Sequence, residues 1–239
     1  MYNEIFEIQV QLYLKENIEL KNSYEKIGTL INFSMNENDF LKQLHTKKGK
    51  YKEYCLSGMY PIEQEKIYKQ GEVYNILIRS YKHNIIKNLH SCLKDLENDN
   101  FIIINVNDIK RYKKSNIDYI DTITPTIVTK DNRCWNYLKD SKEYFDKAIF
   151  NNLVKKYNYL QGINQIFNYE DVIDEINIRN KYAIIINYKG VKFLGYKIRV
   201  YFKDNNIAQE FANLSIAEGV GEKNSSFGQG FVKPYFRKR

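Results

Sequence analysis

The chain has 239 residues, enough for one large domain or two small ones. It carries 37 Lys and Arg against 29 Asp and Glu, and this net charge of +8 is compatible with a polyanionic partner. No apolar run approaches the roughly 20 residues that would span a bilayer, which excludes a helical membrane protein and leaves no membrane partner. The opening MYNEIFEIQVQLYL alternates and lacks the regions of a signal peptide, so we expect a cytoplasmic protein.

The first half of the sequence predicts strands and helices in a definite order. Residues 5–14 alternate with period two, as a strand with one buried face does. The apolar spacing indicates helices over 22–34 and 39–45 and a longer one over 82–97. Further strands are predicted at 51–61, 72–81 and 100–109. The order strand, helix, strand, strand, helix, strand is that of a ferredoxin-like βαββαβ unit.

The second half repeats this order. A strand at 119–129 precedes a helix at 141–160, and a long hairpin turns at the Lys189-Gly190 dipeptide. A helix over 206–218 and a last strand at 230–236 complete the unit. We therefore predict an α+β fold of two tandem ferredoxin-like domains, residues 1–115 and 116–239, with antiparallel sheets and helices on one face.

A glycine-rich segment, EGVGEKNSSFGQGFVKP, occupies residues 218–234. It does not match a P-loop, because the lysine and hydroxyl of that motif are missing and a helix precedes the glycines. Backbone amides freed by glycine, with polar side chains beside them, can hold sugar-phosphate oxygens; the structural alternative is a helix cap and a turn into the last strand. The predicted RNA-contacting residues of this segment are Gly219, Gly221, Lys223, Asn224, Ser225, Ser226, Gly228 and Gly230.

Basic residues gather at residues 42–52, at 110–114 and at the C-terminus, with tyrosines among them. Such clusters are typical of phosphate-binding surfaces, although each alone also fits a solvated loop or tail. The predicted phosphate contacts here are Lys47, Lys48, Lys50, Arg237 and Lys238.

The sequence gives little support for a metal site or a catalytic thiol. The cysteines at 55, 92 and 134 show no C-x-x-C spacing, so we expect reduced, structural side chains. The acidic stretch YEDVIDE, with Asp171, Asp174 and Glu175, is interpreted as a solvated face because no further acidic pattern completes a cation site. We expect no metal and no cofactor.

One histidine is the candidate acid or base. His83 and His90 flank the apolar stripe of the helix at 82–97 and are interpreted as half-exposed helical residues. His45 ends the helix at 39–45 and begins the densest lysine cluster, with Lys52 seven residues on. A helix C-terminus raises an imidazole pKa and nearby lysines lower it, so we expect the pKa of His45 to lie near neutral pH.

Three segments together resemble a known family. Leu44-His45, KEYCLS at 52–57 and EGVGEKNSSFGQGFV at 218–232 are similar to the CRISPR-associated endoribonucleases of the Cas-six (Cas6) family, in the RAMP superfamily. The layout of the whole chain agrees, and the glycine-rich segment is the most specific match. Two positions depart from the family pattern. Leu30 or Ile31 stands where many relatives have a tyrosine on the first helix, and GQG stands where many have an aromatic residue between the last glycines.

The resemblance implies an activity and its residues. It implies metal-independent cutting of precursor CRISPR RNA by attack of a 2′-hydroxyl on the adjacent phosphate, which leaves a 2′,3′-cyclic phosphate and a 5′-hydroxyl. His45 would act as base or acid and Lys52 would stabilise charge, while the third catalytic role is unassigned. The implied partners are CRISPR repeat RNA and other Cas proteins of an effector complex, with the protein a monomer or homodimer. The alternatives are a non-catalytic RNA-binding subunit of such a complex and an RNA-binding protein unrelated to CRISPR.

Overall fold

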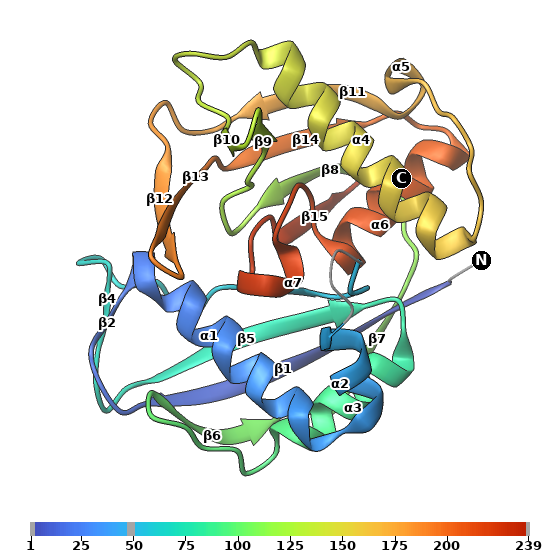
Figure 1. Ribbon diagram of the computed structural model, residues 1–239. Helices are drawn as coiled ribbons and strands as arrows, with labels where there is room; N and C mark the ends of the chain where they lie inside the picture. The colour runs from blue at the N-terminus through green and yellow to red at the C-terminus, as the bar shows by residue number, and fades with distance from the viewer. Residues whose placement is uncertain (1–2, 47–50, 238–239) are drawn as a thin grey trace.

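The computed structural model describes residues 3–46 and 51–237 and contains two four-stranded βαββαβ units joined end to end (Figure 1). The first unit has the strand order β3-β5-β1-β6, and β7 (Lys110–Lys113) extends the same edge of β1. Its elements are β1 (Glu4–Leu14), α1 (Leu20–Ser34), β3 (Cys55–Leu56), β5 (Val73–Ser80), α3 (His83–Leu93) and β6 (Phe101–Val106). The described pairings within this sheet are antiparallel.

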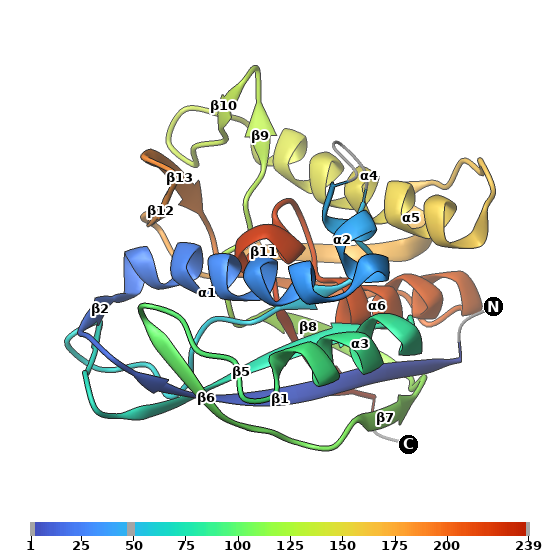
Figure 2. The same ribbon diagram turned by 60° about the horizontal axis from the view of Figure 1, so that its bottom comes forward.

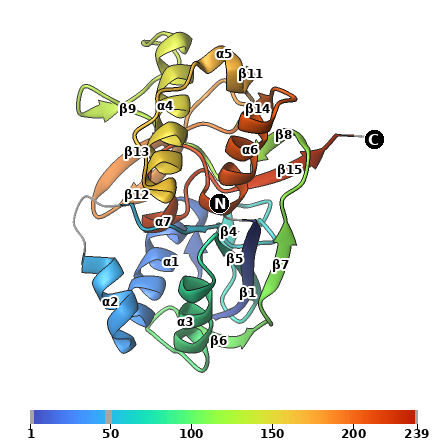
Figure 3. The same cartoon turned by 90° about the vertical axis from the view of Figure 1, so that its right-hand side faces the viewer.

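The second unit has the corresponding order β11-β14-β8-β15. Its elements are β8 (Ile117–Thr122), α4 (Lys142–Gln161), β11 (Ile173–Ile178), β14 (Ile198–Phe202), α6 (Asn206–Glu218) and β15 (Val232–Phe236). In both units the second, third, first and fourth strands lie side by side in that order, which is the ferredoxin-like arrangement. Figure 3 shows α1, α3, α4 and α6 on one side of the two sheets. The predicted fold is confirmed.

Smaller elements decorate this frame. Helix α2 (Asp39–Thr46) follows α1 through a short 3-10 turn, Met35–Glu37. A hairpin of β12 (Ile184–Tyr188) and β13 (Val191–Gly195) extends between β11 and β14, and α7 (Asn224–Phe227) lies in the glycine-rich segment. The remaining short elements are β2 (Ile18–Glu19), β4 (Ile67–Tyr68), β9 (Thr129–Lys130), β10 (Arg133–Cys134) and α5 (Tyr169–Val172).

Local sequence explains where the long helices begin and end. Ser141 and Asn205 cap α4 and α6, each accepting a hydrogen bond from the backbone N–H three residues on. Gly162 ends α4 in the left-handed conformation, with a φ of 65°. Helix α3 ends at Leu93, earlier than predicted, because the next residues turn extended and then left-handed at Asp95.

Of the strand predicted at 51–61, only Cys55 and Leu56 form a continuous ladder with β5, and Tyr60 makes an isolated bridge to Asn75. Glu53 has a φ of 56°, which no strand tolerates, so pairing with β5 begins only at Cys55. The predicted long hairpin forms as two successive ladders, β11 with β14 and β12 with β13. A register shift lies near the start of β11, and the second ladder includes the turn at Lys189-Gly190.

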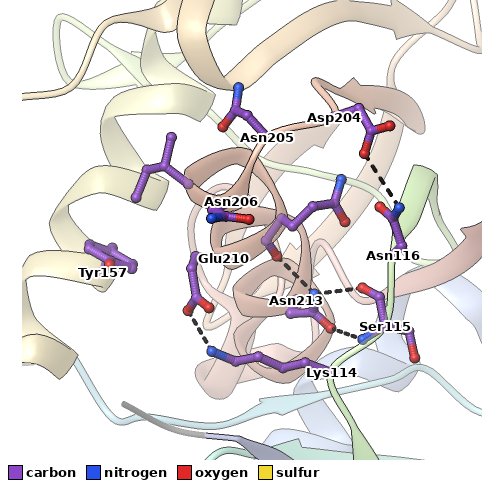
Figure 4. A pocket seen from close by; sticks show the side chains of 11 residues that line it. Lys114, Ser115, Asn116, Tyr157, Asp204, Asn205, Asn206, Glu210 and Asn213 are labelled. Atoms are coloured by element: carbon purple, nitrogen blue, oxygen red, sulfur yellow. Dashed lines mark hydrogen bonds and ion pairs between the residues drawn. The ribbon is translucent and has the colours of Figure 1, made fainter.

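The two units share buried surface. The core of the second unit includes Ile5 and Tyr81, which belong to the first. The connection between the units is fastened to α6, since Ser115 and Asn213 exchange two hydrogen bonds and Lys114 pairs with Glu210 at 2.5 Å. These groups line an open pocket of about 590 Å³ (Figure 4). Figure 4 shows the pairs Lys114–Glu210 and Ser115–Asn213 within this pocket, and they hold the connection to α6.

Within the described ranges, no helix combines the length and apolarity needed to cross a bilayer. Asp174 of the acidic stretch forms a 2.5 Å ion pair with Lys203, and both side chains are exposed. No cluster of three or more potential metal-ligating His, Cys, Asp or Glu residues occurs among the residues described.

Candidate active site

His45 and Lys52 lie together. His45 is on the last turn of α2, a helix held to the core by the buried side chains of Leu41 and Leu44. Lys52 Nζ lies 3.3 Å from His45 Nδ1, and both side chains are half-buried. An ammonium group has only donors, so Nδ1 accepts and Nε2 carries the imidazole proton.

The pKa of His45 is lowered, mainly by burial and then by the charges of Lys52 and Lys189. The pKa of Lys52 is also lowered, by burial and by Lys189. The prediction placed opposing influences on the pKa of His45; burial, followed by Lys52 and Lys189, lowers it. A neutral imidazole is therefore favoured near neutral pH, which is the form that can accept a proton.

The residues beside Lys52 are anchored to the second unit. Tyr51 Oη donates to Glu218 Oε2 at 2.5 Å, and Tyr54 Oη donates to the carbonyl of Ser225 at 3.1 Å. Cys55 is buried, and its thiol points to the carbonyl of Ala217 at 3.3 Å. The segment that carries Lys52 is thus fixed against the end of α6 and against α7, both in the glycine-rich segment or next to it.

The glycines of this segment are buried and packed against backbone. At Gly230 a Cβ would lie 1.8 Å from the carbonyl oxygen of Val220, and φ is +66°. At Gly228, with φ +70°, it would lie 2.8 Å from Leu56 Cδ1 and 3.0 Å from the Leu56 carbonyl. Gly219 caps α6, as in the structural alternative. Close approach of chains therefore accounts for these glycines without a ligand.

Many polar groups of the segment bond within the protein. The N–H groups of Val220, Glu222, Gln229 and Gly230 donate to backbone carbonyls. Asn224 is buried, and its amide donates to the carbonyls of Val220 and Gln229. Lys223 is exposed and Ser225 is half-buried, so these two side chains are the more accessible of the predicted contacts, and RNA contact by the segment stays a prediction.

The other predicted contacts are scattered. Arg237 follows β15, donates to the carbonyl of Phe202 at 2.6 Å, and faces Asp118 and Asp204 at 3.8 and 3.7 Å. In Figure 3 this end of the chain lies away from α2 and α7. Ser226 lies in α7 and its side chain is not described. Lys47, Lys48, Lys50 and Lys238 lie outside the described residues.

A buried lysine that the prediction missed organises the glycine-rich segment. Lys156 of α4 is 4% exposed, and its Nζ donates to the carbonyls of Gly219 and Glu218 at 2.8 and 3.1 Å and to Asn224 Oδ1 at 2.7 Å. The Glu218 carboxylate accepts from Tyr51, as described above, and from the backbone N–H of Tyr81 at 3.3 Å. This Lys156–Glu218–Tyr51 network connects α4, the glycine-rich segment and the residue before Lys52.

Burial sets the ionisation of this network. It raises the pKa of Glu218 to about 8, although hydrogen bonds from Tyr51 and Tyr81 and the charge of Lys156 oppose the rise. Burial likewise lowers the pKa of Lys156 to about 8. Burial also raises the pKa of the Tyr51 hydroxyl well above its usual value, so this group remains a donor.

A pH dependence of stability follows for Glu218→Gln. The folded protein keeps the Glu218 proton to about pH 8, whereas the unfolded chain releases it near 4.5. The folded state binds more protons in this window, so Glu218 makes stability fall as pH rises from about 5 to 8. We expect the variant to lose less stability over this range than wild type in urea unfolding. Parallel curves for the two proteins would contradict the raised pKa.

The chain matches a family model, described as CRISPR associated protein Cas6, C-terminal, over residues 106–234. Among solved structures, the product of a Cas6-related gene from Pyrococcus furiosus superposes with a TM-score of 0.68 at 18% identity, covering 98% of this chain and 100% of that one. An RAMP protein described as binding different RNA substrates gives 0.68 at 17% identity, covering 96% and 99%. Thermus thermophilus Cas6 gives 0.61 at 12% identity, covering 98% and 100%. Comparison with curated proteins gave no match. At sequence identities this low, the structural similarity shows a shared fold and no more.

Proposed function

The chain belongs to the Cas6 family of CRISPR-associated proteins, and we propose that it is a metal-independent endoribonuclease that cuts precursor CRISPR RNA within its repeats. The observation that carries the proposal is the 3.3 Å contact between His45 Nδ1 and Lys52 Nζ. A half-buried imidazole held beside an ammonium group supplies a proton acceptor and a cation at one place. In this proposal residues 1–115 carry the chemistry, and residues 116–239 fix the segment on which Lys52 lies.

The binding of RNA activates the base. In the free protein the Lys52 ammonium occupies Nδ1 of His45. A phosphate oxygen is a stronger acceptor for an ammonium than a neutral imidazole is, because the bond is then between opposite charges. Lys52 turns to the scissile phosphate and leaves Nδ1 free to accept a proton.

The reaction forms one bond and breaks one. The 2′-oxygen attacks the adjacent phosphorus while its proton moves to His45 Nδ1, and Lys52 stabilises the negative charge on the non-bridging oxygens. The bond from phosphorus to the 5′-oxygen breaks, the leaving oxygen takes a proton from solvent water, and His45 then releases its proton to solvent. The products are a 2′,3′-cyclic phosphate and a 5′-hydroxyl.

No tyrosine of α1 joins His45 in the described structure. Tyr24 is 4% exposed and packs with Ile127 and Phe227, and burial raises the pKa of its hydroxyl strongly. Leu30 and Ile31, where relatives have a tyrosine, are buried in the first core. The contribution that this tyrosine makes elsewhere in the family must therefore come from another group here or be absent.

The test of the proposal is the variant His45→Ala. We expect it to cut repeat RNA about 100-fold more slowly in single-turnover assays, because general acid-base catalysis contributes at least this factor. Binding of RNA should be nearly unchanged, since the imidazole carries no charge for phosphates to meet.

The matched control is His90→Ala. His90 is a half-buried histidine on α3, and its pKa is lowered by burial and then by Lys94, with Asp108 opposing. We expect it to cut at the wild-type rate. Equal rates for His45→Ala and wild type would remove His45 from the site. Tight binding without cutting by the wild-type protein would favour a non-catalytic RNA-binding subunit of an effector complex.

A further inference from the structure

The β12–β13 hairpin of the second unit reaches across to the first. Its tip is a two-residue turn in which Lys189 and Gly190 have φ values of 50° and 76°, the left-handed pair typical of tight hairpins. Asn187 Nδ2 donates to Asn22 Oδ1 at 2.7 Å, and the backbone N–H of Lys189 donates to Glu25 Oε2 at 3.0 Å. Both acceptors are on α1, and Figures 1 and 2 show the hairpin beside this helix.

The same hairpin packs on α7. The ring of Tyr188 stacks on Phe227 with centroids 4.2 Å apart and an interplanar angle of 17°, and Phe193 contacts the same ring at 5.4 Å. Helix α7 also receives the hydrogen bond from Tyr54, two residues after Lys52. One short helix therefore positions both the hairpin tip and the segment that carries Lys52.

Lys189 stands at the tip of a hairpin that packs on α7, the helix that also bonds to the segment carrying Lys52. Its side chain is exposed, and within the described part of the chain its ammonium forms no ion pair. Its Nζ lies 5.6 Å from the centroid of the Tyr188 ring. Glu25 accepts from the backbone of Lys189 rather than from its side chain. Lys189 contributes to the lowered pKa of both His45 and Lys52, after burial, so the three groups share one positive field.

We propose that Lys189 is a phosphate-binding residue of the candidate active site, contributed by the second unit and holding a backbone phosphate of the RNA beside the scissile one. This inference rests on the proposed function. Lys52 and Lys189 place two positive charges around the His45 imidazole, and Lys189 has no ion-pair partner among the described residues. The charges repel each other, and a bound polyanion would relieve that repulsion. The backbone of Lys189 is already held by Glu25 of α1, so its ammonium group would also position the RNA strand that it binds.

The test compares Lys189→Gln with Lys192→Gln. Both residues are exposed lysines of the hairpin, and Lys192 lies on β13, beyond the turn. Glutamine keeps the side-chain length and leaves the backbone N–H free to bond Glu25. We expect Lys189→Gln to reduce the salt dependence of repeat-RNA binding by about 0.7 to 0.9 in the slope of log K against log salt, the value of one phosphate contact. Cutting should slow about tenfold. Lys192→Gln should change neither.

A second measurement needs no cutting. We expect the His45 imidazole pKa, followed by NMR in the RNA-free protein, to rise in Lys189→Gln and to stay at the wild-type value in Lys192→Gln. An unchanged salt slope together with an unchanged His45 pKa would overturn the proposal. If wild type binds repeat RNA without cutting it, while the slope and pKa shift as expected, the proposed nuclease activity fails and the phosphate contact of Lys189 stands.

Discussion

A repeat RNA with a single 2′-deoxy nucleotide immediately upstream of the scissile phosphate is expected to remain uncut in the presence of the wild-type protein. The proposed reaction uses this hydroxyl as the nucleophile, so the substitution removes the attacking atom itself. Its affinity should be nearly that of the all-ribose RNA, because every phosphate is retained. Single-turnover cutting of end-labelled RNA, in excess EDTA, measures the first quantity, and equilibrium binding measures the second.

The matched control is the same deoxy substitution one nucleotide further upstream. It changes the RNA equally in composition but leaves the nucleophile in place, so we expect cutting at nearly the all-ribose rate. The products should carry 2′,3′-cyclic phosphate and 5′-hydroxyl ends. Cutting of the first RNA, or cutting that EDTA stops, would contradict the attack by the hydroxyl and would point to an activated water.

The fold could be predicted because its signals are local. Period-two alternation over 5–14 and the apolar stripe over 141–160 each specify an element, and the repeated order of elements specifies the two units. Two errors, in the strand predicted over 51–61 and the helix predicted over 82–97, fall where Glu53 and Asp95 adopt left-handed backbone, because apolar spacing carries no information on φ. The strand predicted over 119–129 ends at Thr122.

Only part of the candidate site could be predicted from the sequence. His45 and Lys52 are seven residues apart and one resemblance covers both. Lys189 is far from them along the chain, and nothing local tells where the tip of a hairpin docks. Lys156 did leave a signal: it lies three residues after Leu153 and seven after Ile149, on the buried stripe of α4, where an unpartnered lysine would be costly.

That signal changes the interpretation of the glycine-rich segment. The segment turns the carbonyl oxygens of Glu218 and Gly219 inward, onto a buried ammonium group, while its contact with RNA stays a prediction. The close approach at Gly228 brings the segment against Leu56 of β3, the strand that follows Lys52, and the close approach at Gly230 is to Val220 within the segment. In our proposal the glycine-rich segment contributes to catalysis by holding Lys52 in place. This role does not depend on any contact that Lys223 or Ser225 makes with RNA.

Lys156→Met is expected to lower the free energy of unfolding by about 3 to 5 kcal/mol, because each buried acceptor left without its donor costs about 1 to 3 kcal/mol. The variant keeps the apolar stem but leaves two backbone carbonyls and the Asn224 amide oxygen without their donor. Urea unfolding followed by circular dichroism measures the change. Lys155→Met, at the exposed neighbouring position on the same helix, should change stability by less than about 0.5 kcal/mol.

A double-mutant cycle separates the charge of Lys156 from its packing. In Lys156→Met the Glu218 carboxylate loses the nearby positive charge that favours its ionised form. Near pH 8, where Glu218 is partly ionised, adding Glu218→Gln removes the buried acid while keeping an acceptor for Tyr51, so the double variant should be more stable than the sum of the single changes predicts. Strict additivity would mean that Lys156 acts only through the carbonyls of the glycine-rich segment. A loss of under 1 kcal/mol for Lys156→Met would mean that the network does not hold the segment in place.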